Sequence, residues 1–123
     1  MRFYEFVTRS NLNQVKKLAN QLWKQLGIDI AFTNHFFDRV NDPRNKPEIT
    51  AEELAELFIK EYHANGKRIE NEDDVVVVLQ DLFTKINIPV KIEDRPNDEK
   101  RLVAKTVMRT DRFLTPQKTY PVR

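Results

Sequence analysis

The sequence contains no cysteine, so it can form neither a disulfide framework nor a thiolate metal site. A chain without cysteine fits a reducing compartment. Its longest apolar run, from Val75 to Leu79, has five residues, whereas a membrane-spanning helix needs roughly 20. Residues 1–6 also lack the long apolar core of a signal peptide. These absences predict a cytoplasmic protein with no membrane partner.

Glycine and serine are scarce as well, which excludes further classes of site. With two glycines, the chain has no glycine-rich loop of the kind that cradles phosphates. Ser10 is the only serine, and its place before an amphipathic stretch suits a helix cap better than a catalytic nucleophile. The acidic residues of 70–74, like His35 with Asp38, lack the spacing of metal ligands. We therefore expect neither a metal ion nor a cofactor.

Neither sign of charge is in large excess, because the sequence has 21 Lys and Arg against 19 Asp and Glu. A net charge of +2 is too small to indicate a nucleic-acid partner by itself. The basic residues are concentrated toward the C-terminus, where residues 100–123 carry seven of them and a single acid, Asp111. Such a segment can face phosphates, or it can be a solvated surface.

Three helices are predicted from apolar residues at helical spacing, each preceded by a capping residue. Their expected ranges are 10–26, 34–40 and 51–64. Thr33 is the N-cap candidate of the second helix, and Thr50 forms a capping box with Glu53 at the start of the third. Gly27 sits where a left-handed C-cap residue belongs, and Asn65-Gly66 is expected to end the third helix.

Strand patterns follow the helices along the chain. Expected strands cover 75–79, 86–93 and 102–108, with a short fourth strand in the tail 113–123 and an N-terminal one over 2–7. Pro89 has no N–H to donate, so its strand needs an edge or a bulge there. Helices first and strands afterwards indicate an α+β fold, in which N-terminal helices pack on a three- to four-stranded antiparallel sheet. The length predicts a single domain over 1–123.

The segment 33–39 holds the most informative pattern. His35, one of two histidines, lies four residues before Arg39, so on a helix both side chains project from one face. An imidazole can transfer a proton near neutral pH, and a guanidinium can hold a phosphate oxygen through two hydrogen bonds. The alternatives are a half-buried histidine bonded to backbone, and an arginine paired with Asp38 or Glu53.

Three features together resemble a known superfamily. The first is the T-x-H-x-x-x-R element at 33–39, followed by Arg44. The second is the helix expected over 51–64, and the third is the strand over 102–109, with Thr115 after it. The combination is similar to small metal-independent nucleases of the barnase–EndoU–colicin–RelE superfamily, in the versions carried by bacteriophages. The resemblance covers most of the chain and implies helices on a four-stranded antiparallel sheet, with RNA as the substrate.

The resemblance also implies a mechanism, in which the ribose 2′-hydroxyl attacks the neighbouring phosphate to give a 2′,3′-cyclic phosphate. Such cleavage needs a base, an acid and cations for the charge that develops on the phosphate. The residues expected to be catalytic are His35, Arg39 and Lys105, with His35 as base or acid. Those expected to bind substrate are Arg44, Thr106, Arg109 and Thr115. Lys105 and Arg109 would share one strand face, roughly 13 Å apart.

Two other functions remain open at this level. The fold could be kept by a noncatalytic RNA-binding or phage assembly protein, which the basic C-terminal segment favours. It could also be a protein–protein adaptor, because of the aromatic N-terminus and the proline-bearing strand. For a phage-encoded protein the expected location is the host cytoplasm. Each candidate side chain could instead be an ordinary surface residue, so only their convergence would support a site.

Overall fold

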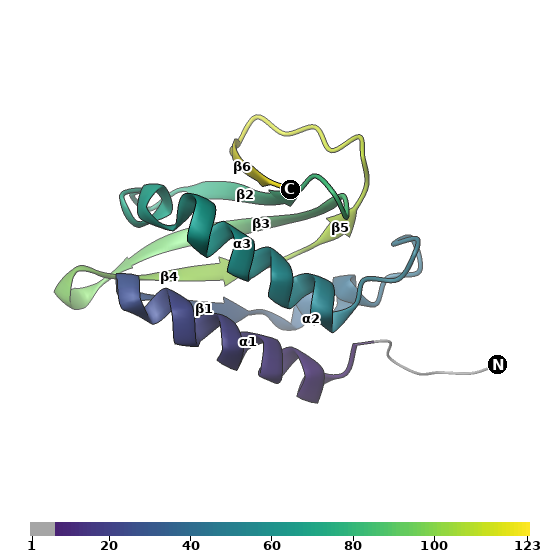
Figure 1. The fold of residues 1–123 in the computed structure, drawn as a ribbon, viewed down its shortest axis with the longest axis horizontal. Helices are drawn as coiled ribbons and strands as arrows, with labels where there is room; N and C mark the ends of the chain where they lie inside the picture. The colour runs from purple at the N-terminus through teal and green to yellow at the C-terminus, as the bar shows by residue number, and fades with distance from the viewer. Residues whose placement is uncertain (1–6) are drawn as a thin grey trace.

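The computed structural model describes residues 7–123, which form a six-stranded sheet with two long helices lying across one of its faces (Figure 1). The helices are α1 (Arg9–Trp23), α2 (Asn34–Val40) and α3 (Ala51–Glu70), with short 3-10 turns η1 (Lys24–Leu26) and η2 (Pro96–Asp98). The strands are β1 (Ile28–Phe32), β2 (Val76–Asp81), β3 (Ile86–Arg95), β4 (Glu99–Ala104), β5 (Met108–Arg109) and β6 (Lys118–Val122). This arrangement confirms the predicted α+β fold. Within these residues, none of the helices has both the length and the apolar character needed to cross a bilayer.

The sheet has the strand order β1-β4-β3-β2-β6, and β5 also pairs with β3. The central strands β2, β3 and β4 are antiparallel, whereas β1 runs parallel to β4 and β6 runs parallel to β2. The prediction of three to four antiparallel strands was therefore correct for the centre and wrong at the edges. The sequence pattern did not predict β1, which has only five residues. Its partner β4 comes after α3 in the chain, so no local pattern indicates the pairing. The strand predicted over 2–7 lies, except for Val7, outside the described residues.

A bulge interrupts the sheet where β4 passes into β5. Pairing of β4 with β3 ends at Ala104 opposite Val90. Pairing of β5 with β3 begins at Met108 opposite Asn87, so three residues of one chain segment oppose two of the other. Pro89, which lacks an N–H, lies in this interval, and the predicted irregularity there is confirmed. The bulge ends the simple alternation that was expected over 102–108.

The two long helices pack on the sheet through one continuous apolar core. Trp23 of α1 and Phe58 of α3 are both 0 % exposed, and the indole N–H of Trp23 donates to the carbonyl of Phe58 at 3.1 Å. The N-cap of helix α1 lies two residues earlier than expected, because Thr8 and not Ser10 caps the helix. The Thr8 hydroxyl accepts the N–H of Asn11 at 3.0 Å.

Helix α3 continues to Glu70, past the end that was predicted at Asn65-Gly66. Gly66 lies inside the helix, where an added Cβ would come within 3.0 Å of Cδ1 of Leu26. The glycine therefore permits close packing of α3 against η1 and does not terminate the helix. Asn65 is also an interior residue of the helix: it is buried, and its side-chain amide donates to the Glu61 carboxyl at 2.8 Å.

The capping box at the start of α3 is confirmed and gives a stability prediction. The Thr50 hydroxyl accepts the N–H of Glu53 at 3.0 Å, and the Glu53 carboxylate accepts the N–H of Thr50 at 3.0 Å. Because Thr50→Ala leaves a helix N–H without its acceptor, it should lower the free energy of unfolding by about 1 kcal/mol in urea denaturation. Ser10→Ala, which removes an exposed hydroxyl in the first turn of α1, is the matched control. Equal losses in the two variants would contradict the assignment.

Candidate nucleic-acid site

Helix α2 presents His35 and Arg39 on its outer face. Thr33 caps the helix as predicted, its hydroxyl accepting the N–H of Phe36 at 3.1 Å. The apolar side chains of α2, Phe36 among them, are buried, and His35 is exposed. Nε of Arg39 donates to Nε2 of His35 at 3.2 Å, which confirms that the pair shares one face. This hydrogen bond requires an unprotonated Nε2 on the imidazole.

Asp42 joins Arg39 to Arg44. Its carboxylate accepts from Nη1 of Arg39 at 3.3 Å and from Nη2 of Arg44 at 2.8 Å. Hydrogen bonds from the side chain and backbone of Arg44 hold the pKa of Asp42 well below its ordinary value. The carboxylate that pairs with Arg39 is thus Asp42, and neither Asp38 nor Glu53. One ionised carboxylate orients two guanidinium groups.

A pocket of about 460 Å³ opens beside these arginines, and we call it the arginine pocket. Its lining consists of Arg39, Asp42, Arg44, Asn45 and residues 106–110. Asn45, which is 5 % exposed, connects the α2 side of the pocket to the β5 side. Its Nδ2 donates to the carbonyl of Arg39 at 2.8 Å, and its Oδ1 accepts the N–H of Arg109 at 3.0 Å. The pocket thus forms where the loop after α2 meets β5, at the right-hand end of the molecule in Figure 1.

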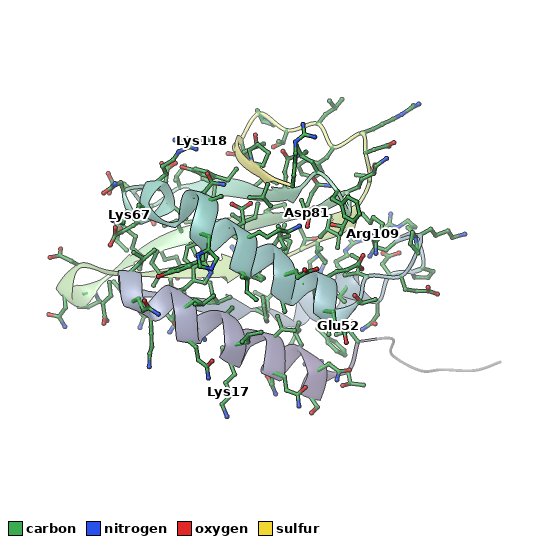
Figure 2. All side chains as sticks on the ribbon, viewed as in Figure 1. Lys17, Glu52, Lys67, Asp81, Arg109 and Lys118 are labelled. Carbon is green, nitrogen blue, oxygen red and sulfur yellow. The ribbon has the colours of Figure 1, made fainter. Side chains whose placement is uncertain are left out.

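Arg109 lines this pocket, but protein atoms accept all five of its guanidinium N–H groups. Nε donates to the carbonyl of Pro47, Nη1 to Thr84 and Glu53, and Nη2 to Glu48 and Glu53. The side chain is 8 % exposed, and its Nη2 lies 2.6 Å from Oε1 of Glu53. The pKa of the Glu53 carboxyl lies below its ordinary value. Burial alone would raise it, but the hydrogen bonds that the carboxylate accepts from Arg109 and from Thr50 lower it by more. Arg109, which is labelled toward the right of Figure 2, therefore fastens β5 to the start of α3 through these hydrogen bonds. In this arrangement it has no N–H left for a substrate.

The remaining predicted residues divide between the pocket and other places. Thr106 lines the pocket. Lys105 is exposed, and its carbonyl accepts from the hydroxyl of Thr33 at 3.4 Å, so its backbone lies beside the start of α2. Because of the bulge, Lys105 and Arg109 do not continue one regular strand face, as their spacing had predicted. Thr115 lies in the loop between β5 and β6 and is not part of the pocket lining within residues 7–123.

Two residues that shape the pocket were not predicted. Asp42 follows Arg39 by three residues and precedes Arg44 by two, a spacing that brings its carboxylate within reach of both. A local signal for Asp42 therefore existed in the sequence. Asn45 gave no such signal, because its partners belong to α2 and β5, which are far apart along the chain.

The chain matches no known family model, no curated protein and no solved structure. The resemblance to nucleases of the barnase–EndoU–colicin–RelE superfamily accordingly stays a prediction.

Proposed function

We propose that the arginine pocket binds the phosphodiester backbone of RNA, and that the chain cleaves this backbone without a metal ion. The observation that carries the proposal is the position of Arg39, which lines the pocket with Arg44 and also bonds His35. Two guanidiniums share one carboxylate, Asp42, so positive charge remains for a phosphate. A phosphate held by Arg39 would lie next to the imidazole of His35.

The arrangement suggests how binding and proton transfer are coupled. In the free protein the Nε2 lone pair of His35 accepts from Arg39. When Arg39 turns toward a phosphate oxygen, this lone pair is released and can take the proton of the 2′-hydroxyl. The 2′-oxygen then attacks phosphorus, and the bond from phosphorus to the 5′-oxygen breaks. Lys105, which is exposed and whose carbonyl lies beside the start of α2, is the proposed proton donor to that leaving oxygen. Arg39 and Arg44 would stabilise the charge on phosphorus.

Replacing His35 with alanine is the test of this proposal. The wild-type protein should cut transfer RNA in EDTA and leave 2′,3′-cyclic phosphate ends, which gel electrophoresis and mass spectrometry detect. His35→Ala should reduce the rate about 100-fold, because it removes the proton acceptor. His63→Ala is the matched control, since this second histidine is exposed on α3 and stacks edge-on against Tyr62, at a ring separation of 5.2 Å.

Two results would refute catalysis at this site. The first is an unchanged rate in His35→Ala, and the second is cleavage that requires an added divalent metal. Equal losses in the His35 and His63 variants would indicate a general effect on folding and would contradict the assigned role of His35.

A noncatalytic RNA-binding protein is the second candidate. The observation that favours it is that His35 bonds Arg39 from outside and does not itself line the pocket. In that case the imidazole only supports the arginine that holds the phosphate. Binding of labelled RNA would then weaken steeply with added salt, while no cyclic phosphate product forms.

A further inference from the structure

A second hollow adjoins the arginine pocket. It has a volume of about 620 Å³ and shares Arg109 and Thr110 with that pocket. Its lining also includes Lys46, Lys85 and Phe83, and we call it the lysine hollow. Because the two depressions meet at Arg109 and Thr110, one extended ligand could contact both.

Phe83 is held in solvent by a hydrogen-bonded turn between β2 and β3. Its side chain is 82 % exposed, although Asp81 beneath it is buried. The Asp81 carboxylate accepts the N–H groups of Phe83 at 2.9 Å and of Thr84 at 3.1 Å, and Lys60 pairs with the same carboxylate at 2.6 Å. The Asp81 carbonyl also accepts the N–H of Lys85 at 2.7 Å. The protein thus presents, on a fixed support, an aromatic ring that its own core does not use.

The cations around this ring are available to an anionic ligand. Lys46 is exposed. Lys85 is 53 % exposed, and its Nζ lies 3.4 Å from Asp111, a carboxylate that is itself 62 % exposed. An ion pair as open as this contributes little and exchanges readily for another anion. The other carboxylate of the hollow, that of Glu53, is paired with Arg109 and not with these lysines.

We propose that the two depressions form one groove for single-stranded RNA. The backbone follows Arg39 and Arg44 and then Lys46 and Lys85, and one base stacks on Phe83. This inference rests on the proposed function, because it takes RNA as the ligand. An exposed aromatic ring among cations suits a single strand, since every base has a face that can stack. Paired bases in a duplex hide those faces, and protein-binding surfaces are usually poor in lysine.

The experiment measures binding of a short labelled oligouridine with 2′-O-methyl groups, which lacks the hydroxyl needed for cleavage. Fluorescence anisotropy gives the Kd at one fixed, low salt concentration. Phe83→Ala should raise the Kd about tenfold, because the stacking surface is lost. Phe83→Tyr should retain most of the affinity. Leu114→Ala is the matched control, since Leu114 is 93 % exposed and lines neither depression, so its Kd should equal that of the wild type.

The outcomes separate this inference from the proposed function. If Arg44→Ala weakens binding and Phe83→Ala does not, the proposal of a single RNA groove is contradicted, while RNA binding at the arginine pocket is supported. A protein would then be the better candidate for the occupant of the lysine hollow. If a duplex of equal length binds as tightly as the single strand and depends equally on Phe83, the single-strand preference is overturned. If the wild-type protein binds no RNA even at low salt, the proposed function fails, and this inference fails with it.

Discussion

Replacing Glu61 with glutamine is expected to raise the free energy of unfolding by roughly 3 kcal/mol at pH 7. Glu61 lies on α3 and is 0 % exposed. Burial raises the pKa of its carboxyl to about 8. The hydrogen bond from Asn65 opposes this rise, whereas the nearby charge of Asp81 adds to it. Asp81 stays ionised because Lys60 and two backbone N–H groups hold it, so the two buried carboxyl groups divide into one charged and one neutral member.

The sign of the effect follows from the two pKa values of Glu61, 4.5 in the unfolded chain and about 8 in the folded protein. Below pH 4.5 both states hold the proton, so the substitution should change little. Between these values the unfolded chain releases a proton that the folded protein keeps. The stability of the wild type therefore falls by about 1.4 kcal/mol per pH unit from this group. Glutamine, which does not ionise, removes that loss.

Urea denaturation across this pH range measures the prediction. The gain in Glu61→Gln should be small in mild acid and should grow steadily as the pH approaches 8. Glu56→Gln is the matched control, because Glu56 is exposed on the same helix. A pH dependence in Glu61→Gln identical to that of the wild type would show that the Glu61 carboxyl is not held protonated.

Replacing Arg109 with methionine is expected to lower the free energy of unfolding by about 3–5 kcal/mol. Methionine keeps most of the apolar volume but makes none of the five hydrogen bonds of the guanidinium. The half-buried carboxylate of Glu53 would lose the cation that balances its charge, and the carbonyls of Pro47, Glu48 and Thr84 would lose their donors. Removing one partner of such a network costs far more than an exposed ion pair contributes.

The same denaturation measurement tests this prediction. Arg112→Met, an exposed arginine of the following loop, should change the stability by less than about 0.5 kcal/mol. Combining Arg109→Met with Glu53→Gln should recover part of the loss, because the second substitution removes the unbalanced charge. An Arg109→Met variant as stable as Arg112→Met would mean that Arg109 does not fasten β5 to α3, and that it is free to contact substrate.

Much of the candidate site could be predicted from local sequence. The His35–Arg39 pair depends only on a helix over 34–40, and Thr33 caps that helix through an N–H three residues away. Gly66 shows the limit of such reasoning. A glycine near an expected helix end can close the helix or can admit a neighbouring element, and only the contact with Leu26 separates the two.

The residues around the bulge show why the rest of the site could not be predicted. The spacing of Lys105 and Arg109 predicts a shared face only if the strand is regular. The bulge opposite Pro89 removes that regularity and leaves Arg109 bonded to Glu53 of α3. A cation that looks available to substrate in the sequence is therefore a structural residue in the fold.

The sequence by itself determined the presence of the three helices, the caps at Thr33 and Thr50, and the histidine–arginine pair. Each of these depends on residues within about one helical turn of each other, where backbone geometry alone sets the contact. Only the tertiary structure decided the parallel edges of the sheet and the partners of Arg109, which lies 56 residues from Glu53. Contacts at that separation form because burial makes a paired charge or a paired strand favourable, and no local pattern records which distant segment supplies the partner.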